Sequence, residues 1–274
     1  MTAAVGWNLW LGTVKGGIDP VNRGLLQREL MGIHAVWWRE FKVFQREKSR
    51  VVSSVFQPLI WLFLFGGGVG ASVSMGGIHY QDYIYPGILA MMVLFGSVFF
   101  GLYIVWDRKL DVLKAILVAP VSRISIFFGK VMGGCTDIMI QVFILFIFSF
   151  LFPTIHTSGI PMAMLILLIT AIAMVSLGLA VGSLFESLEG FQVVSTFLVF
   201  PLFFLSGALF PVDERLPVWL RGIVKINPLT YTVDGVRGSL LGLYSFPLFV
   251  DIGVITCFAT LMLLVGSILF SRMK

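Results

Sequence analysis

Residues that could perform chemistry are few in this chain, and none of them has the spacing of an active site. His34, His79 and His156 stand far apart, without the short spacings of metal ligands, and no pair of carboxylates is placed for acid–base work. A phosphate-binding loop of the form G-x-x-x-x-G-K-[ST] is missing, since the glycine-rich stretch at 66–72 has no lysine. We therefore expect no catalytic, metal or cofactor site on this chain, and ATP hydrolysis only on another chain.

Proton or sodium coupling is the other chemistry to consider, because carriers that use it place ionisable side chains inside the membrane. Within the spans drawn below, Asp137 is the residue that we consider for this role. We expect it to face a polar bundle interior near the membrane surface. A relay role for Asp137 stays open as the alternative.

The elements that must position these residues follow from composition. Hydrophobic residues make up 58% of the chain and charged residues 12%, which is typical of an integral membrane protein. Long charge-free runs that are apolar on every face favour spanning helices over a barrel. We predict an all-α integral membrane protein with a segment at 1–50 and a transmembrane domain at 51–274, with six transmembrane helices at about 51–73, 83–106, 126–151, 161–184, 190–210 and 248–271.

Lysine and arginine are distributed unevenly about these spans. Eight precede the first span, five lie between Asp107 and Lys130, two lie at the C-terminus, and four lie on the opposite side. The positive-inside rule then makes both termini of this multi-pass protein cytoplasmic. The net charge of +5 is explained by cations facing anionic membrane lipids, so we expect no nucleic-acid partner. Cys135 and Cys257 fall inside spans and are expected to be free thiols.

Residues 22–50 have the pattern of a basic amphipathic helix on the cytoplasmic side. Apolar residues recur at spacings of three and four, while arginine and lysine occupy another face. The apolar face includes Leu30, Trp37, Phe41 and Phe44. The helix is either an interfacial anchor or a lever against a soluble partner, and both can be true.

A second cytoplasmic element lies at about 107–121, between the second and third spans. Leu110, Leu113 and Leu117 form one face of a short helix that Pro120 ends, and Asp107 and Lys114 face elsewhere. Such a turn can be a simple connection, but an apolar face in water suits a groove on a partner. We therefore expect docking.

The segment at about 211–238 is too apolar for a loop and too charged for a span. Trp219 and Leu220 lie among Arg215, Arg221 and Lys225. This pattern indicates a segment at the outer membrane surface that dips partway in.

Several motifs run through these elements. The most specific are FLSGALFP at 204–211, LPVWL at 216–220, and NPLTY at 227–231 followed by Asp234 and Arg237. YPG at 85–87, IVWDR at 104–108 and LVAPVSR at 117–123 add to them. Together these segments, over about 30–274, resemble the ABC-2 type permease family. Its members are membrane subunits of ATP-binding-cassette exporters, including exporters of daunorubicin-type drugs, nodulation lipo-oligosaccharides and O-antigen.

The resemblance implies a dimer of like six-helix permeases in a prokaryotic cytoplasmic membrane, with two cytoplasmic ATPase subunits that bind ATP and Mg²⁺. Residues 22–50 become its interface helix, 107–121 its coupling helix, and 211–238 its external pair of re-entrant half-helices. Lys109 and Asp111 depart from the family pattern, which leaves the docking contacts themselves open. The residues expected to dock on the ATPase are Asp107, Arg108, Leu110, Leu113, Lys114 and Leu117.

The function expected from these features is export of an amphiphilic drug, lipid or lipid-linked glycan, and an ion-coupled carrier or channel is the alternative. Aromatic residues of the second and fifth spans are candidates to line the pathway, and the external segment is the candidate gate. These pathway or gate residues are Phe95, Phe99, Phe200, Phe203, Pro211, Trp219 and Leu220.

Overall fold

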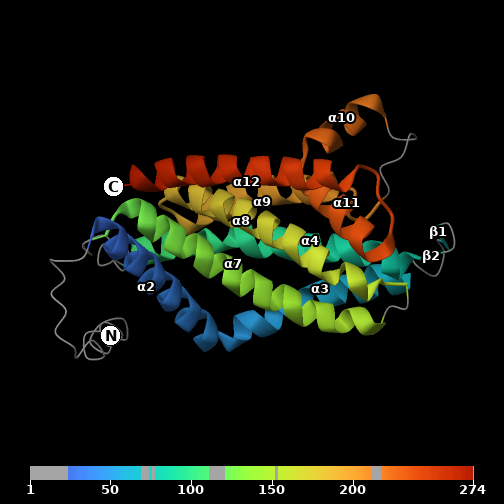
Figure 1. The fold of residues 1–274 in the computed structure, drawn as a ribbon, viewed down its shortest axis with the longest axis horizontal. Helices are drawn as coiled ribbons and strands as arrows, with labels where there is room; N and C mark the ends of the chain where they lie inside the picture. The colour runs from blue at the N-terminus through green and yellow to red at the C-terminus, as the bar shows by residue number, and fades with distance from the viewer. Residues whose placement is uncertain are drawn as a thin grey trace.

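The computed structural model describes residues 24–68, 74–75, 78–110, 121–151, 154–210 and 217–273. Its helices run along one long axis and form a bundle (Figure 1). The elements before the middle of the chain are α2 (Leu25–Arg46), α3 (Lys48–Gly68), β1 (Ser74–Met75), β2 (Ile78–His79), α4 (Tyr80–Phe100) and α5 (Leu102–Lys109). Those that follow are α7 (Arg123–Ile147), η2 (Phe148–Leu151), η3 (Thr157–Gly159), α8 (Ile160–Leu184), α9 (Leu188–Phe204), α10 (Val218–Ile226), α11 (Pro228–Leu241) and α12 (Leu248–Ser271).

The described residues are almost entirely helical, as predicted, with one antiparallel pair of two-residue strands. Four helical segments in this part of the chain are long and apolar enough to cross a membrane: Tyr80–Lys109, Arg123–Ile147, Thr157–Leu184 and Leu248–Ser271. The first and fifth predicted spans correspond to α3 and α9, whose shorter apolar stretches are Val55–Phe65 and Leu188–Phe204. The molecule is therefore an all-helical membrane protein, and the full count of six spans stays a prediction.

Most predicted bounds differ from the helix bounds by a few residues, and for two of them the packing shows the reason. The second predicted span ends at residue 106, but the helix continues to Lys109. After an interruption at Gly101, α4 is followed directly by α5. At Gly101 the chain lies so close to α8 that an added Cβ would stand 2.0 Å from the Gly178 carbonyl oxygen. The fifth span ends at Phe204 rather than 210, since the backbone turns at 205–207. Of the predicted coupling helix, residues 111–120 lie outside the described residues.

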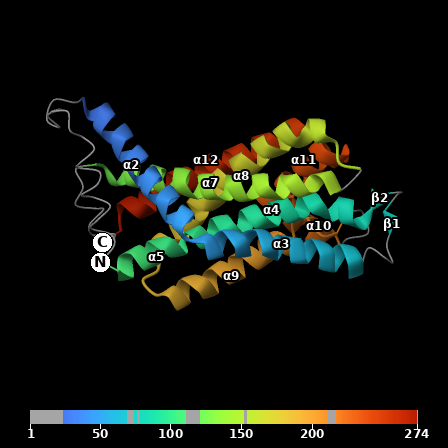
Figure 2. The same ribbon diagram turned by 90° about the horizontal axis from the view of Figure 1, so that it is seen from below.

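The core is built around α4 and α8. Side chains of α4 are buried around nearly its whole circumference, whereas α9 and α12 bury one stripe each. In Figure 2, α4 lies between α7 on one side and α3 and α9 on the other, and α8 and α12 are seen behind α7. A helix that is apolar all round must be enclosed by others, while a helix buried on one side keeps an outer face.

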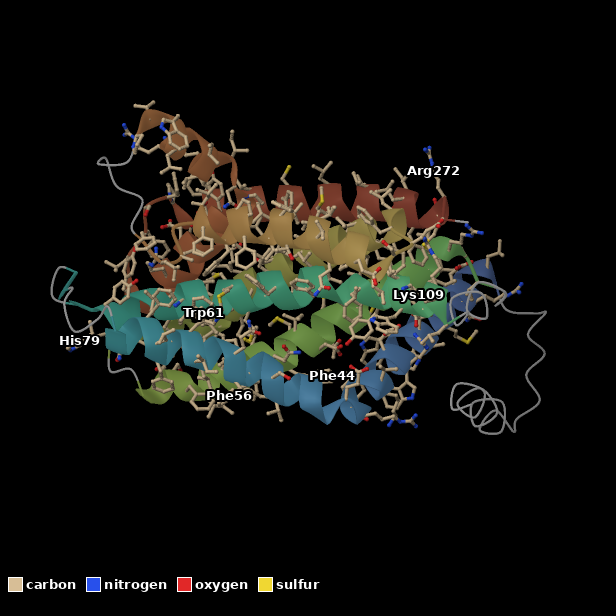
Figure 3. All side chains as sticks on the ribbon, turned by 180° about the vertical axis from the view of Figure 1, so that it is seen from behind. Phe44, Phe56, Trp61, His79, Lys109 and Arg272 are labelled. Carbon is tan, nitrogen blue, oxygen red and sulfur yellow. The ribbon has the colours of Figure 1, made fainter. Side chains whose placement is uncertain are left out.

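The bundle has two distinct ends. The start of α2, the end of α5, the start of α7 and the C-terminus share one end, which we call the α2 end (Figure 1). The strands, α10 and α11 share the other, which we call the α10 end. In Figure 3, Lys109 and Arg272 lie at the α2 end and His79 at the α10 end.

Candidate functional site

Four charged side chains from three helices meet at the α2 end. Lys130 Nζ of α7 lies 2.7 Å from Asp107 Oδ2 of α5 and 3.0 Å from Glu40 Oε1 of α2. Arg39 of α2 donates to the same two carboxylates, at 2.7 Å to Glu40 Oε1 and 3.1 Å to Asp107 Oδ1. We call Arg39, Glu40, Asp107 and Lys130 the charge network. Its two cations and two anions balance.

Two members of the charge network are buried, and the other two, Arg39 and Asp107, are partly exposed. The Lys130 side chain is 0% exposed and that of Glu40 is 5% exposed. An unpaired charge at such depth costs several kcal/mol, so each member depends on the others. Burial disfavours the charged guanidinium of Arg39, but the Glu40 and Asp107 carboxylates outweigh this and raise its pKa. The four charged groups therefore stabilise one another, and the network as a whole carries no net charge.

Glycines on α7 let α2 come close enough to form this network. A Cβ added at Gly133 would lie 2.6 Å from the Glu40 Cβ, and one at Gly129 would lie 2.7 Å from the Val36 Cβ. Glycines spaced by four residues form a flat stripe on which a second helix packs closely. Trp37 adds a hydrogen bond of 2.9 Å from its indole N–H to Thr136 Oγ1.

A separate contact joins α2 to the start of α7. Glu29 of α2 accepts hydrogen bonds from the backbone N–H of Ser122 at 3.0 Å and from its hydroxyl at 2.7 Å. The same hydroxyl oxygen caps α7 by accepting from the Ser125 N–H. Helix α2 therefore holds both flanks of the segment that connects α5 to α7, at Asp107 on one side and at Ser122 on the other.

The predicted docking residues are placed only in part. Asp107 belongs to the charge network, and Leu110 is 64% exposed just beyond α5. Arg108 points back into its own chain, where its guanidinium donates to the Phe185 oxygen at 3.1 Å and the Ser183 oxygen at 3.3 Å. It thereby satisfies carbonyls at the end of α8. Three further predicted docking residues lie outside the described residues: Leu113, Lys114 and Leu117.

The predicted interface-helix residues divide between the two sides of α2. Phe44 is buried, Trp37 contacts α7, and Phe41 stacks on Trp37 with ring centroids 6.1 Å apart. Leu30, near the start of the helix, is 57% exposed. The helix thus packs along α7 over its second half and presents apolar residues outward over its first turns.

The predicted pathway aromatics form a cluster between α4 and α9. The Phe95 ring makes edge contacts with Phe200 at 5.6 Å and with Phe203 at 6.0 Å, and it lies 6.4 Å from Phe99. Phe203 is buried, whereas Phe200 is exposed on the outer face of α9. The sequence therefore identified residues that do meet, and the cluster opens on one side of the bundle.

Motif residues at the α10 end tie helices α10 and α11 to the bundle. Asn227 separates α10 from α11, accepts from the Leu229 N–H at 3.0 Å and donates to the Leu202 oxygen at 2.7 Å. Asp234 accepts from the backbone N–H groups of Ser245 and Phe246.

Arg237 completes this end of the bundle. It donates to the Gly207 oxygen at 3.0 Å and lies over the Tyr83 ring at 4.0 Å from the centroid. The motifs thus fix the junction between α9, α11 and α4. Of the predicted gate residues, Trp219 is exposed, Leu220 is half-buried, and Pro211 lies outside the described residues.

Sequence reasoning missed Glu40 and Lys130. The charge count placed Lys130 with the cytoplasmic segment, although it falls inside the third span as drawn, and it is fully buried. Glu40 could have been found, because it stands four residues from both Val36 and Phe44 on the buried stripe of α2. A carboxylate on such a stripe requires a cation on the facing helix.

Asp137 and Asp251 are the other carboxyl groups to place. Asp137 is buried in α7, as expected for a residue that faces the bundle interior. Asp251, in the first turn of α12, is fully buried, and neither of its carboxyl oxygens meets a hydrogen-bond donor within the described residues. No group of three or more metal-ligating side chains occurs among the residues that the structure describes.

Comparison with known proteins places the chain among transporters. The model of the family described as ABC-2 type transporter matches residues 31–241. Nodulation protein J of Rhizobium leguminosarum bv. viciae is 27% identical over 242 residues, which cover 87% of this chain and 93% of that protein. The putative transport permease ycf38 of Cyanophora paradoxa is 33% identical over 251 residues, covering 85% and 86%. The inner membrane transport permease YadH of Escherichia coli is 27% identical over 250 residues, covering 88% and 95%.

Proposed function

The chain belongs to the ABC-2 type transporter family, and from this membership we propose that it is the permease subunit of an exporter driven by ATP hydrolysis on a separate subunit. Two cytoplasmic ATP-binding-cassette subunits bind ATP and Mg²⁺, and a second copy of this chain or a like permease completes the pathway. Both termini and the α2 end face the cytoplasm of a prokaryotic cell. The chain itself performs transport and no catalysis.

The arrangement at the α2 end is the observation that carries this proposal. The segment between α5 and α7 is the expected docking element, and helix α2 is bonded to both of its flanks, through Arg39 to Asp107 and through Glu29 to Ser122. A push on this segment therefore reaches α2, α5 and α7 together rather than bending one loop. Coupling of this kind requires rigid elements that move between states as units.

The route of the substrate is proposed between the two permeases. ATP-driven closure of the partner subunits moves the docking segments, the two permeases rock, and a path along the α4–α9 aromatics opens toward the outside. Phe95, Phe99 and Phe200 offer apolar ring faces to an amphiphilic substrate such as a drug, lipid or lipid-linked glycan. The α10–α11 pair narrows the exit.

Loss of the docking face tests this proposal. The double variant Leu113→Ala and Leu117→Ala is expected to abolish substrate-stimulated ATPase activity and export, measured with the partner subunit in proteoliposomes. The matched control is Leu165→Ala with Leu261→Ala, which removes two exposed leucines from the outer faces of α8 and α12. Both doubles should assemble and unfold like the wild type. Full export by the docking double would contradict the proposal.

Gate contact is tested separately by cysteine labelling. Single cysteines at Trp219 and Leu220 are expected to change their rate of labelling by a membrane-impermeant thiol reagent when substrate and ATP are added. A cysteine at Phe249, exposed on α12, is the control and should label at one rate throughout. If the labelling rate at positions 219 and 220 does not change with substrate or ATP, α10 does not form part of the exit.

An ion-coupled carrier is the second candidate, and one observation favours it. Asp251 is a buried carboxyl group in a candidate span, and its oxygens meet no donor within the described residues. Carriers use such groups to bind protons. Vanadate-insensitive transport driven by a proton gradient, lost in Asp251→Asn, would support this candidate. Vanadate-sensitive transport unaffected by Asp251→Asn would support the ATP-driven exporter.

A further inference from the structure

An apolar groove runs along the outer side of α7, and none of its lining residues belongs to the α4–α9 aromatics. It has a volume of about 770 Å³ and opens to the surface of the bundle. This volume lies in the range of pockets that hold small molecules. Three helices line it, with Met132, Met139 and Phe143 from α7, Leu168 and Ile172 from α8, and Leu263 from α12.

The helices around the groove indicate that it opens toward membrane lipid rather than water. All three lining helices are among the segments long and apolar enough to cross a membrane. A groove on their outer surface therefore opens into the hydrocarbon core of the bilayer. An apolar ligand in such a groove gains close packing with the wall rather than escape from water.

One edge of the groove leads to an aromatic cluster on α2. Thr136 lines the groove and accepts the hydrogen bond of the Trp37 indole. The Trp37 ring packs against the rings of Phe41 and Trp38, with distances between ring centroids of 6.1 Å and 6.0 Å. Tryptophan clusters of this kind are characteristic of the membrane–water interface, where lipid headgroups lie.

A cation completes this edge. The exposed Lys42 ammonium stands over the Trp38 ring at 4.7 Å from its centroid. Lys42 also donates to Gln45 at 3.4 Å, and it forms no ion pair within the described residues. A cation held at headgroup level attracts an anionic phosphate, because the surface of an anionic leaflet and basic side chains near it favour each other.

From this order of groove, aromatic cluster and cation, we propose that the groove holds one acyl chain of an anionic phospholipid whose headgroup lies at Lys42. The site is separate from the transport pathway proposed above. A bound lipid of this kind fills the angle between α7, α8 and α12 and keeps α2 in place along α7.

Lipid retention by the purified full-length protein tests the groove. The protein is reconstituted in nanodiscs of phosphatidylglycerol and phosphatidylcholine with identical acyl chains, released into detergent, and analysed by native mass spectrometry. One retained phosphatidylglycerol per chain is expected. Leu168→Trp, which fills the groove, should lower that retained fraction about fivefold, because contacts of the acyl chain with the wall are lost.

The matched control for the groove is Leu165→Trp. Leu165 lies one turn away on α8, is exposed to a similar degree, and does not line the groove. It should retain phosphatidylglycerol like the wild type. Equal retention by the Leu168 and Leu165 variants would overturn the proposal, as would a photo-crosslinker at Leu168 that captures a peptide from residues 1–23 of this chain instead of lipid.

The headgroup contact is tested by Lys42→Gln. This change should lower the preference for phosphatidylglycerol over phosphatidylcholine about fivefold while an acyl chain stays bound, since a surface cation contributes on the order of 1 kcal/mol. Lys109→Gln, which removes another exposed lysine at the α2 end, should keep the preference. An unchanged preference in Lys42→Gln would overturn the assignment of the headgroup to this residue.

Discussion

The two ends of the bundle are held together by different kinds of interaction. At the α2 end, four charges from three helices bind one another, two of them buried and two partly buried, and each carboxylate meets two cations. At the α10 end, single side chains bind backbone groups, as Asn227 and Arg237 do at the carbonyls of Leu202 and Gly207. The first arrangement fails as a whole when one member is lost, whereas the second can lose one contact at a time.

This difference bears on which parts can move. The α2 end joins α2, α5 and α7 into one body, which suits an element that must transmit force. Helix α10 is joined to the bundle mainly near its end, where Thr230 and Tyr231 donate to the Val224 and Lys225 oxygens. Its outer residues are exposed, as Figure 1 shows by the way α10 projects from the bundle. A short helix anchored at one end can tilt about Asn227.

The largest effect is expected at the charge network. Lys130→Met leaves Glu40 and Asp107 buried with only Arg39 to neutralise them, and should destabilise the protein by about 3–5 kcal/mol. The measurement is the thermal midpoint and the yield of monodisperse protein in detergent. Lys109→Met, at the exposed end of α5, should behave like the wild type. Comparable stability of the two variants would show that the network is not what makes the α2 end rigid.

A smaller effect is expected at the junction of the half-helices. Asn227→Ala removes the cap of α11 and the bond to Leu202, which together stabilise by about 1–2 kcal/mol. Asn227→Asp keeps the acceptor for the Leu229 N–H and should lose less. The same thermal measurement applies. If Asn227→Ala costs as much as Lys130→Met, the two ends do not differ in cooperativity.

A substitution on α10 should lower export without lowering the stability of the protein. Trp219 is 67% exposed, so Trp219→Ala should change the free energy of unfolding by no more than about 0.5 kcal/mol. Export should nonetheless fall several-fold if α10 narrows the exit. Phe249→Ala, at an exposed position of α12, should leave both quantities unchanged. A large loss of stability in Trp219→Ala would mean that α10 is packed and does not tilt.

The smallest effect concerns pH at the α2 end. Hydrogen bonds from Ser125 and Ser122 lower the pKa of Glu29, so its contribution to stability is present above its unfolded pKa of about 4.3 and is lost as pH falls through the lower folded value. Wild type should therefore be slightly more stable than Glu29→Gln at neutral pH, and the two thermal midpoints should converge in acid. A constant difference between them down to about pH 3 would contradict this assignment.

The sequence allowed most helices to be placed, and the exceptions have specific causes. Apolar runs between charges located α3, α4, α7, α8, α9 and α12, because the bilayer selects segments by length and composition. Helix ends differ from the predicted span ends where tertiary contacts set them, as at Gly101 against Gly178 and at Phe204 before the turn that Arg237 binds. The predicted docking and gate residues at Leu113 and Pro211 stay predictions, since they lie outside the described residues.

The candidate site shows the same division. The aromatics Phe95, Phe200 and Phe203 could be chosen by type and span, and they do meet. Glu40 and Lys130 stand 90 residues apart in the chain, and their pairing could not be read from either one alone. Ion pairs are decided by which helix faces which, and that depends on the glycines of α7 that admit α2.

By itself, the sequence determined that this is a helical membrane protein of the ABC-2 type, because hydropathy, charge and motif are local properties of the chain. Only the tertiary structure decided that Arg39, Glu40, Asp107 and Lys130 form one ion-pair network, that Arg108 binds its own α8, and that α2 holds both flanks of the segment that connects α5 to α7. These are contacts between residues distant in sequence, and their strength arises from burial, which exists only once the helices have packed.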